Sequence, residues 1–263
     1  MTRKFKRLKD LDVSLEIKND GFIRPPRDGQ RNWLLNKALN EFVADLIHLD
    51  ALSSRFVPGA ETDHFEDRSK KMLEEKDIME DWQIPVMKAM VDLVTESHGD
   101  VLEVGFGRGV ASTYIQEVGV ESHTIIECND FIVNRFSDWE KGYLGRKISL
   151  IHGKWQDVSD RLDKYDGILF HTYPLDEDEY VEYAVKSTTF AEHFFATAAG
   201  HLRPGGNFTY FTNEIDSLSR AHQRLLLEYF RRFSLSIFRP LEVPRDTKDA
   251  MWGDSVVLVK AVK

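Results

Sequence analysis

Val101-Leu-Glu-Val-Gly-Phe-Gly-Arg-Gly109 is the stretch that decides the fold. Its first four residues are typical of a buried strand, the glycines form a turn, and a helix is expected at 111–117. Glycines at the end of such a strand let backbone N–H groups approach a ligand, toward which the next helix directs its positive N-terminus. The spacing Gly-x-Gly-x-Gly differs from the Gly-x-Gly-x-x-Gly of dinucleotide binders. Glu103, just before the turn, would repel a pyrophosphate, so it indicates a cationic or amine-bearing ligand.

Strands and helices alternate from residue 100 onward. Further strands are expected at 123–127, 148–151, 165–170 and 207–212, and helices at 130–140, 187–202 and 217–232. Two last β-rich runs, 234–243 and 255–262, have no helix between them and therefore predict an antiparallel pair. Alternating strands and helices form a parallel sheet through right-handed crossovers. The chain therefore predicts a Rossmann-like α/β fold with a mostly parallel sheet.

A helical region is expected ahead of this domain. Apolar residues recur at helical spacing across 31–52, and the charged stretch 64–80 is expected to form a second helix. A third helix begins near Pro85, where a missing N–H costs nothing. We therefore divide the chain into an N-terminal helical extension or lid, residues 1–80, and a ligand-binding domain, residues 81–263. The N-terminal helices either cap the site or form a homodimer contact.

Charge and cysteine content restrict the class of partner. The chain has 263 residues and a net charge of −9, which argues against a protein built to grip a nucleic acid backbone. The single cysteine, Cys128, excludes an intrachain disulfide and a thiolate-rich metal site, and it fits a reducing, cytoplasmic location. No apolar run is long enough to span a membrane. We expect a small-molecule partner and neither nucleic acid nor membrane.

Two side chains after later strands suit a nucleoside. Glu127 ends the second strand, where an acid can accept hydrogen bonds from both ribose hydroxyls, although such a carboxylate can also simply face solvent. Trp155 follows the third strand and would flank an adenine, or it would be a core tryptophan. Next to the glycine turn, the nucleoside interpretation is favoured for both.

Several strings in order resemble guanidinoacetate N-methyltransferase and its relatives. They are Val101-Leu-Glu-Val-Gly-Phe-Gly107, Ile125-Ile-Glu-Cys-Asn-Asp130, Trp155-Gln-Asp-Val158, Tyr165-Asp-Gly-Ile-Leu169, Thr172-Tyr-Pro-Leu175 and Leu202-Arg-Pro-Gly-Gly206. The resemblance runs from about residue 82 to residue 212. It implies a class I methyltransferase fold of seven strands with the last antiparallel, and S-adenosylmethionine (SAM) as cosubstrate. No metal is expected, because the histidines outside the site show no ligand spacing.

The resemblance also implies a set of site residues. Trp155 and Gln156 would lie beside adenine, Met87 close to the sulfonium, and Tyr173 near the acceptor pocket. The residues expected to contact the cofactor are Met87, Glu103, Gly105, Gly107, Glu127, Cys128, Trp155, Gln156 and His171.

The chain departs from the family where the acceptor binds. The acid that precedes Thr-Tyr-Pro in the guanidino enzymes is His171 here, and the acid of their Trp-Glu-x-Pro segment is Gln83. Because a guanidinium pairs bidentately with carboxylates, losing both costs several kcal/mol of recognition in a buried site. Guanidinoacetate is therefore not the expected substrate.

Other groups take the place of that clamp. An imidazole accepts a proton near neutral pH, so His171 is the expected general base. Tyr173 supplies a hydroxyl and an aromatic face that stabilises a cation, and we assign it a catalytic and a substrate-binding role. Gln83 and Asn213 are neutral hydrogen-bonding groups expected to bind the substrate, although purely structural roles fit them equally well.

Three functions fit this pattern. The first is methyl transfer from SAM to a small-molecule amine or hydroxyl acceptor in small-molecule biosynthesis. The second is cyclisation of SAM itself to azetidine-2-carboxylate with release of methylthioadenosine, as in synthases that resemble class I methyltransferases. The third is a catalytically inactive SAM-binding protein. We rank them in this order.

Overall fold

The computed structural model divides the chain into two units, Met1–Asp63 and His64–Lys263. It describes residues 16–17, 23–24, 72–180, 182–183, 187–212, 214, 218–244 and 255–263. In the first unit the described residues form a short antiparallel pair, β1 (Glu16–Ile17) and β2 (Ile23–Arg24). The helix expected at 31–52, and with it the homodimer contact through the N-terminal helices, lies outside the described residues.

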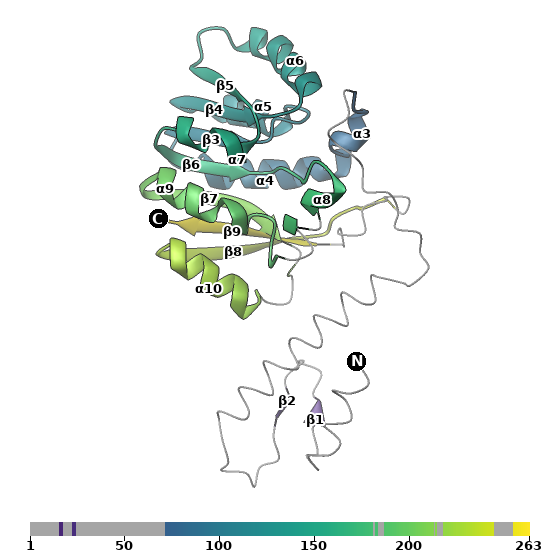
Figure 1. Ribbon diagram of the computed structural model, residues 1–263, viewed down its shortest axis with the longest axis vertical. Helices are drawn as coiled ribbons and strands as arrows, with labels where there is room; N and C mark the ends of the chain where they lie inside the picture. The colour runs from purple at the N-terminus through teal and green to yellow at the C-terminus, as the bar shows by residue number, and fades with distance from the viewer. Residues whose placement is uncertain are drawn as a thin grey trace. The chain divides into compact units, whose positions relative to one another are not determined.

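The second unit is built on a seven-stranded sheet of order β5-β4-β3-β6-β7-β9-β8 (Figure 1). Its strands are β3 (Asp100–Val104), β4 (Ser122–Glu127), β5 (Ile148–His152), β6 (Tyr165–Phe170), β7 (Leu202–Thr212), β8 (Arg232–Phe238) and β9 (Val256–Val262). From β5 to β7 every pair is parallel, whereas β9 is antiparallel to both β7 and β8. The predicted Rossmann-like α/β fold, with its antiparallel last strand, is confirmed.

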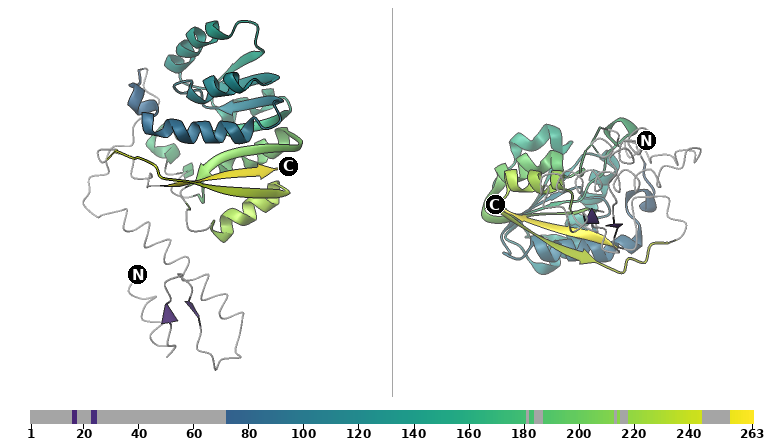
Figure 2. Two further views of the ribbon diagram at one scale, coloured as in Figure 1. Left: turned by 180° about the vertical axis from the view of Figure 1, so that it is seen from behind. Right: turned by 90° about the horizontal axis from the view of Figure 1, so that it is seen from below.

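Helices cover both faces of this sheet (Figure 2). The helices are α3 (Glu75–Ile78), α4 (Ile84–Val94), α5 (Val110–Val118), α6 (Asp130–Trp139), α7 (Trp155–Val158), α8 (Glu177–Tyr180), α9 (Glu192–His201) and α10 (Arg220–Tyr229), with 3-10 turns η1 (Asp81–Gln83), η2 (Glu140–Tyr143) and η3 (Ser159–Arg161). Among the described residues, no helix is both long enough and apolar enough to cross a membrane.

The central strand β3 shows why the sheet is buried on both sides. Leu102 and Val104 pack with α9 and α10, while Val101 packs with α4 and α5 on the opposite face. Successive side chains of a strand point to opposite faces, so a strand covered on both sides is apolar throughout. Because β3 is parallel to β4 and β6, its carboxyl end and the glycine turn lie at the same end of the sheet as the carboxyl ends of these two strands.

Several predicted boundaries differ from the structure: β7 begins at Leu202 and not at residue 207, and α10 is shorter than the predicted 217–232. Two further differences have a visible local reason. The helix expected from residue 187 begins at Glu192, whose carboxylate accepts from the amides of Thr188 and Thr189 and so holds these residues in a turn. The strand expected to reach residue 243 ends at Phe238, two residues before Pro240, which has no N–H for the sheet.

Candidate functional site

The turn after β3 requires glycine. Three glycines have positive φ, Gly105 (95°), Gly107 (54°) and Gly109 (74°). A Cβ at Gly105 would lie 2.5 Å from the carbonyl oxygen of His171, and one at Gly107 would lie 3.2 Å from Ile78 Cγ2. Only a residue without a side chain accepts both this backbone and these contacts. The turn therefore forms a narrow cradle at the N-terminus of α5.

Glu127 faces that turn from the end of β4. Its Oε2 accepts from the amides of Phe106 (3.0 Å) and Gly107 (3.3 Å), and its Oε1 accepts from those of Cys128 (2.7 Å) and Asn129 (2.9 Å). A carboxylate offers about four lone-pair sites, so backbone amides occupy all of them. Ribose hydroxyls would have to replace some of these amides, and the ribose contact stays a prediction.

Glu103 lies beneath α5 and is 1% exposed. Its Oε2 accepts from Ser112 Oγ on α5 and lies 2.9 Å from Nε2 of His123 on β4. His123 is fully buried, and its Nδ1 lies 3.1 Å from Gln116 Nε2. These contacts tie β3, β4 and α5 together below the glycine turn. Sequence reasoning missed His123 as a partner of Glu103, and a cofactor contact by Glu103 stays a prediction.

The residues expected beside adenine begin α7. Trp155 is half-buried, and its ring meets those of Phe170 (centroids 6.0 Å apart) and Phe194 (5.5 Å) edge-on. Gln156 is also half-buried. Trp155 therefore packs against the core and keeps part of its surface open, and its place beside adenine stays a prediction.

Three further expected residues have mainly structural surroundings. Met87 is 1% exposed within α4 and belongs to the core. Gln83 is 7% exposed, and its Oε1 accepts from the amide of Glu80 at 3.0 Å, which caps the η1 turn. Burial, with Glu127 beside it, raises the pKa of the Cys128 thiol to about 12. Their roles toward cofactor or substrate stay predictions.

The residues expected to face the acceptor follow β6. The amide of His171 donates to the carbonyl of Val104, so β6 continues beside the first residues of the turn. The ring of His171 lies 6.1 Å from that of Tyr173, perpendicular to it, and 5.8 Å from that of Phe211 at the end of β7. Phe211 is partly buried and packs against the apolar core to which α4 and α5 contribute. Asn213 lies outside the described residues.

A sequence model of guanidinoacetate N-methyltransferase matches residues 57–221, which is more than half of the chain. The chain belongs to this family. It is a SAM-dependent transferase with the class I methyltransferase fold.

The chain is also similar to proteins of other names. It is 26% identical over 144 residues to protein arginine N-methyltransferase 2 of Candida glabrata, covering 51% of this chain and 32% of that protein. It is 28% identical over 145 residues to the protein of that name from Yarrowia lipolytica, covering 51% and 28%. The match thus spans about a third of these relatives. Spermidine synthase from Thermotoga maritima has a similar structure, with a TM-score of 0.49, 12% identity and coverage of 69% and 60%.

The site of this methyltransferase has the chemistry that SAM requires. The glycines of the turn carry no side chain between a ligand and the backbone, and Trp155 offers a half-buried aromatic face. A ribose hydroxyl would reach Glu127 only by displacing one of the amides that the carboxylate now binds. Bound SAM supplies a sulfonium-activated methyl group. Among the described ranges, no three His, Cys, Asp or Glu side chains are grouped to hold a metal ion.

Arg108 was not among the residues predicted from the sequence. Its guanidinium binds the segment 75–81, next to the glycine turn. Its Nη1 donates to the carbonyl of Met79 (2.8 Å) and to Asp81 Oδ1 (2.7 Å), and its Nε lies 3.0 Å from Glu75 Oε2. Arg135 of α6 also pairs with Glu75. We call residues 72–83 the strap. The only sequence signal was a charged residue between two glycines.

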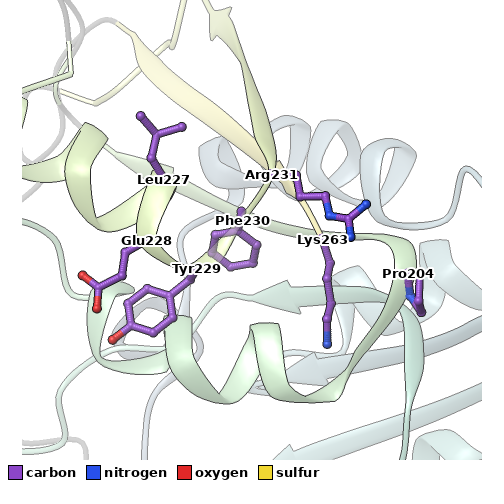
Figure 3. Close-up of a pocket in the computed structure, with 7 residues that line it drawn as sticks. All are labelled: Pro204, Leu227, Glu228, Tyr229, Phe230, Arg231 and Lys263. Atoms are coloured by element: carbon purple, nitrogen blue, oxygen red, sulfur yellow. The ribbon is translucent and has the colours of Figure 1, made fainter.

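A separate hollow lies where β7 and β8 begin and β9 ends (Figure 3). The residues that line it are Pro204, Leu227, Glu228, Tyr229, Phe230, Arg231 and Lys263. The glycine turn is at the opposite ends of the parallel strands. The ammonium of Lys263 donates to the carbonyl of Ala199 at the end of α9. This hollow is therefore not part of the candidate site.

Proposed function

We propose that this methyltransferase transfers the methyl group of SAM to a small-molecule amine or hydroxyl acceptor that carries no guanidinium. The observation that carries the proposal is the surroundings of His171. A histidine replaces the family's acid: its backbone carbonyl faces Gly105, and the neighbours of its ring are the aromatic rings of Tyr173 and Phe211. Such a set suits an acceptor that enters neutral and loses a proton, whereas a guanidinium requires carboxylates.

The reaction then follows from the arrangement. The acceptor nitrogen or oxygen attacks the methyl carbon in line, the carbon–sulfur bond breaks, and its electron pair goes to sulfur. A ring nitrogen of His171 takes the proton that the acceptor loses. The aromatic faces of Tyr173 and Phe211 favour the positive charge near them. The protein contributes two things: the glycine turn positions SAM, and His171 acts as the base.

The names of the curated relatives favour a second candidate. Both carry the name protein arginine N-methyltransferase 2, so the guanidinium of an arginine side chain is the competing acceptor. Cyclisation of SAM and an inactive SAM-binding protein, the alternatives left by the sequence, gain no support from the comparisons. A cytoplasmic location and a part in small-molecule biosynthesis belong to the same proposal.

One assay separates these functions. The purified protein is incubated with SAM alone, then with a panel of small amines and hydroxyl compounds, with guanidinoacetate, and with arginine-containing proteins. We expect S-adenosylhomocysteine to accumulate only with a member of the amine and hydroxyl set. Methyl incorporation into guanidinoacetate or arginine contradicts the proposal, and methylthioadenosine from SAM alone would establish cyclisation instead.

A further inference from the structure

One ion pair joins the loop before α7 to α8, the helix that follows the loop after β6. The first loop leads from β5 into α7 and carries Lys154 directly before Trp155. The second follows β6, carries His171 and Tyr173, and leads into α8. Lys154 Nζ lies 2.7 Å from Glu179 Oε1. The cofactor side and the acceptor side are thus connected directly, between residues 25 positions apart.

Glu179 also shapes the acceptor-side loop. Its second oxygen, Oε2, accepts from the amide of Leu175 at 2.9 Å, and its own amide donates to Asp176 Oδ1 at 2.9 Å. The amide of Tyr180 donates to the carbonyl of Asp176 at 3.0 Å. One carboxylate therefore closes the loop from residue 175 to residue 179 and holds it against Lys154.

The ion pair between Lys154 and Glu179 is partly shielded from solvent, so its interaction is stronger than that of a fully exposed pair. The side chain of Glu179 is 16% exposed and that of Lys154 42%. The hydrogen bond to Glu179 raises the pKa of Lys154, so the ammonium is held in its charged form. Trp155, the neighbour of Lys154, packs against Phe170 at the end of β6, which places α7 beside the strand that leads into the acceptor-side loop.

We propose that Glu179 is a positioning residue that couples occupation of the adenine side of the site to the shape of the acceptor-side loop. The inference rests on the proposed function, because it assigns adenine to the α7 side and the acceptor to the β6 side. A ligand that fixes Trp155 and Gln156 fixes Lys154, and Lys154 then holds Glu179 and the amide of Leu175. Such coupling is reciprocal, so an ordered acceptor loop also favours cofactor binding.

Hydrogen exchange with S-adenosylhomocysteine as the probe tests the coupling without an identified acceptor. In the wild type, the probe slows exchange of the amides in 172–180, by roughly two- to five-fold as expected for a partly exposed ion pair. Glu179→Gln keeps an oxygen for the amide of Leu175 but loses the charge, and Lys154→Met loses the ammonium. Both variants lose the slowing while calorimetry shows the probe still bound.

Matched variants separate coupling from simple damage. Lys154→Arg retains the charge and keeps the slowing, as does Asp178→Asn, which changes an exposed neighbour of Glu179 on α8. The double variant Lys154→Met/Glu179→Gln behaves like either single one. Slowing that persists in both single variants overturns the proposal, as does a wild type that binds the probe with no change in 172–180. A wild type that does not bind the probe at all overturns the proposed function as well, and calorimetry identifies that case.

Discussion

The carbonyl oxygen of His171 lies so close to Gly105 that a Cβ on the glycine would stand 2.5 Å from it. The backbone of the candidate base therefore lies directly against the first glycine of the turn, with no space between them for a side chain. The amide of His171 is bound to the carbonyl of Val104. In this arrangement, the backbone of the acceptor side shapes the cofactor turn directly.

Gly105→Ala is expected to abolish SAM binding. The backbone at Gly105 has a φ of 95°, and the new methyl group would overlap the carbonyl of His171. The control is Gly145→Ala, because Gly145 has a similar φ of 87° but nothing within 4 Å of its Cβ among the described residues. Both variants incur the strain of a left-handed residue, about 1–2 kcal/mol. Calorimetry with S-adenosylhomocysteine should show loss of binding in the first variant only, and equal binding in both would refute the close contact.

His171→Ala is expected to lower kcat by about 10²–10⁴-fold, the usual contribution of a general base. Because the backbone of His171 supports the turn while its ring faces Tyr173 and Phe211, affinity for SAM should change little. Steady-state kinetics with the acceptor found in the panel measures kcat, and calorimetry measures affinity. His201→Ala at the end of α9 is the control. An unchanged kcat in His171→Ala removes His171 from the mechanism.

Cys128 is expected to resist alkylation in the folded protein. Burial, with Glu127 adjacent, raises the pKa of its thiol to about 12 from an ordinary value of 9.0. Only the thiolate reacts, and at pH 8 its fraction falls from roughly one in ten to roughly one in 10⁴. Labelling with iodoacetamide, followed by mass spectrometry, should therefore be about 10³-fold slower than for the urea-unfolded chain. A difference below tenfold would contradict this burial.

A buried chain of hydrogen bonds supports the end of β7. His222 Nε2 lies 2.5 Å from the Tyr210 hydroxyl, and its Nδ1 lies 2.5 Å from Glu214 Oε2. His222→Phe keeps an aromatic ring but removes the hydrogen bonds to both partners, and Glu214 retains only the amide of Ser219 on its Oε1. We therefore expect a loss of about 2–4 kcal/mol in the free energy of unfolding, measured in urea. Tyr210→Phe removes one end only and should cost about 1 kcal/mol. Equal stability of His222→Phe and wild type would show that the chain of bonds contributes nothing.

The free energy of unfolding is also expected to depend on pH, through the carboxyl group of Glu214. Burial alone would raise the pKa of Glu214, but hydrogen bonding and charge from His222 outweigh it, and the pKa is lowered. A carboxyl with a lowered pKa in the folded state stabilises the protein above its ordinary pKa of 4.5, and this contribution is lost as pH falls through the folded value. Urea titrations between pH 7 and 3 should show a steeper acid decline for wild type than for His222→Phe. Parallel declines would refute the coupling.

Local sequence patterns predicted the sheet and the glycine turn, because a buried strand requires a short apolar run and a positive φ favours glycine. The partners of charged side chains follow from no such local pattern. Glu103 meets His123 beneath α5, and Glu179 meets Lys154 across two loops, through contacts that only the folded topology creates. The sequence marked Glu103 as a cofactor contact and passed over Glu179. The departures at Gln83 and His171 were visible only against a family pattern.

Arg108→Met is expected to loosen the strap without unfolding the domain. The guanidinium binds Met79, Asp81 and Glu75, but the side chains of Asp81 and Glu75 are 82% and 59% exposed, so their ion pairs contribute little. The bond to the Met79 carbonyl dominates, and the three together are worth about 1–2 kcal/mol. Amide exchange in 75–80 should accelerate by about five- to thirty-fold, as that free energy implies. Because Ile78 lies against Gly107, a loosened strap should also weaken SAM binding.

The control is Arg135→Met, which removes only a second ion pair to Glu75. It should change amide exchange less than threefold, in line with the smaller contribution of one exposed ion pair. Unchanged exchange in Arg108→Met would mean that apolar contacts of Leu73 and Met79, both buried, hold the strap by themselves.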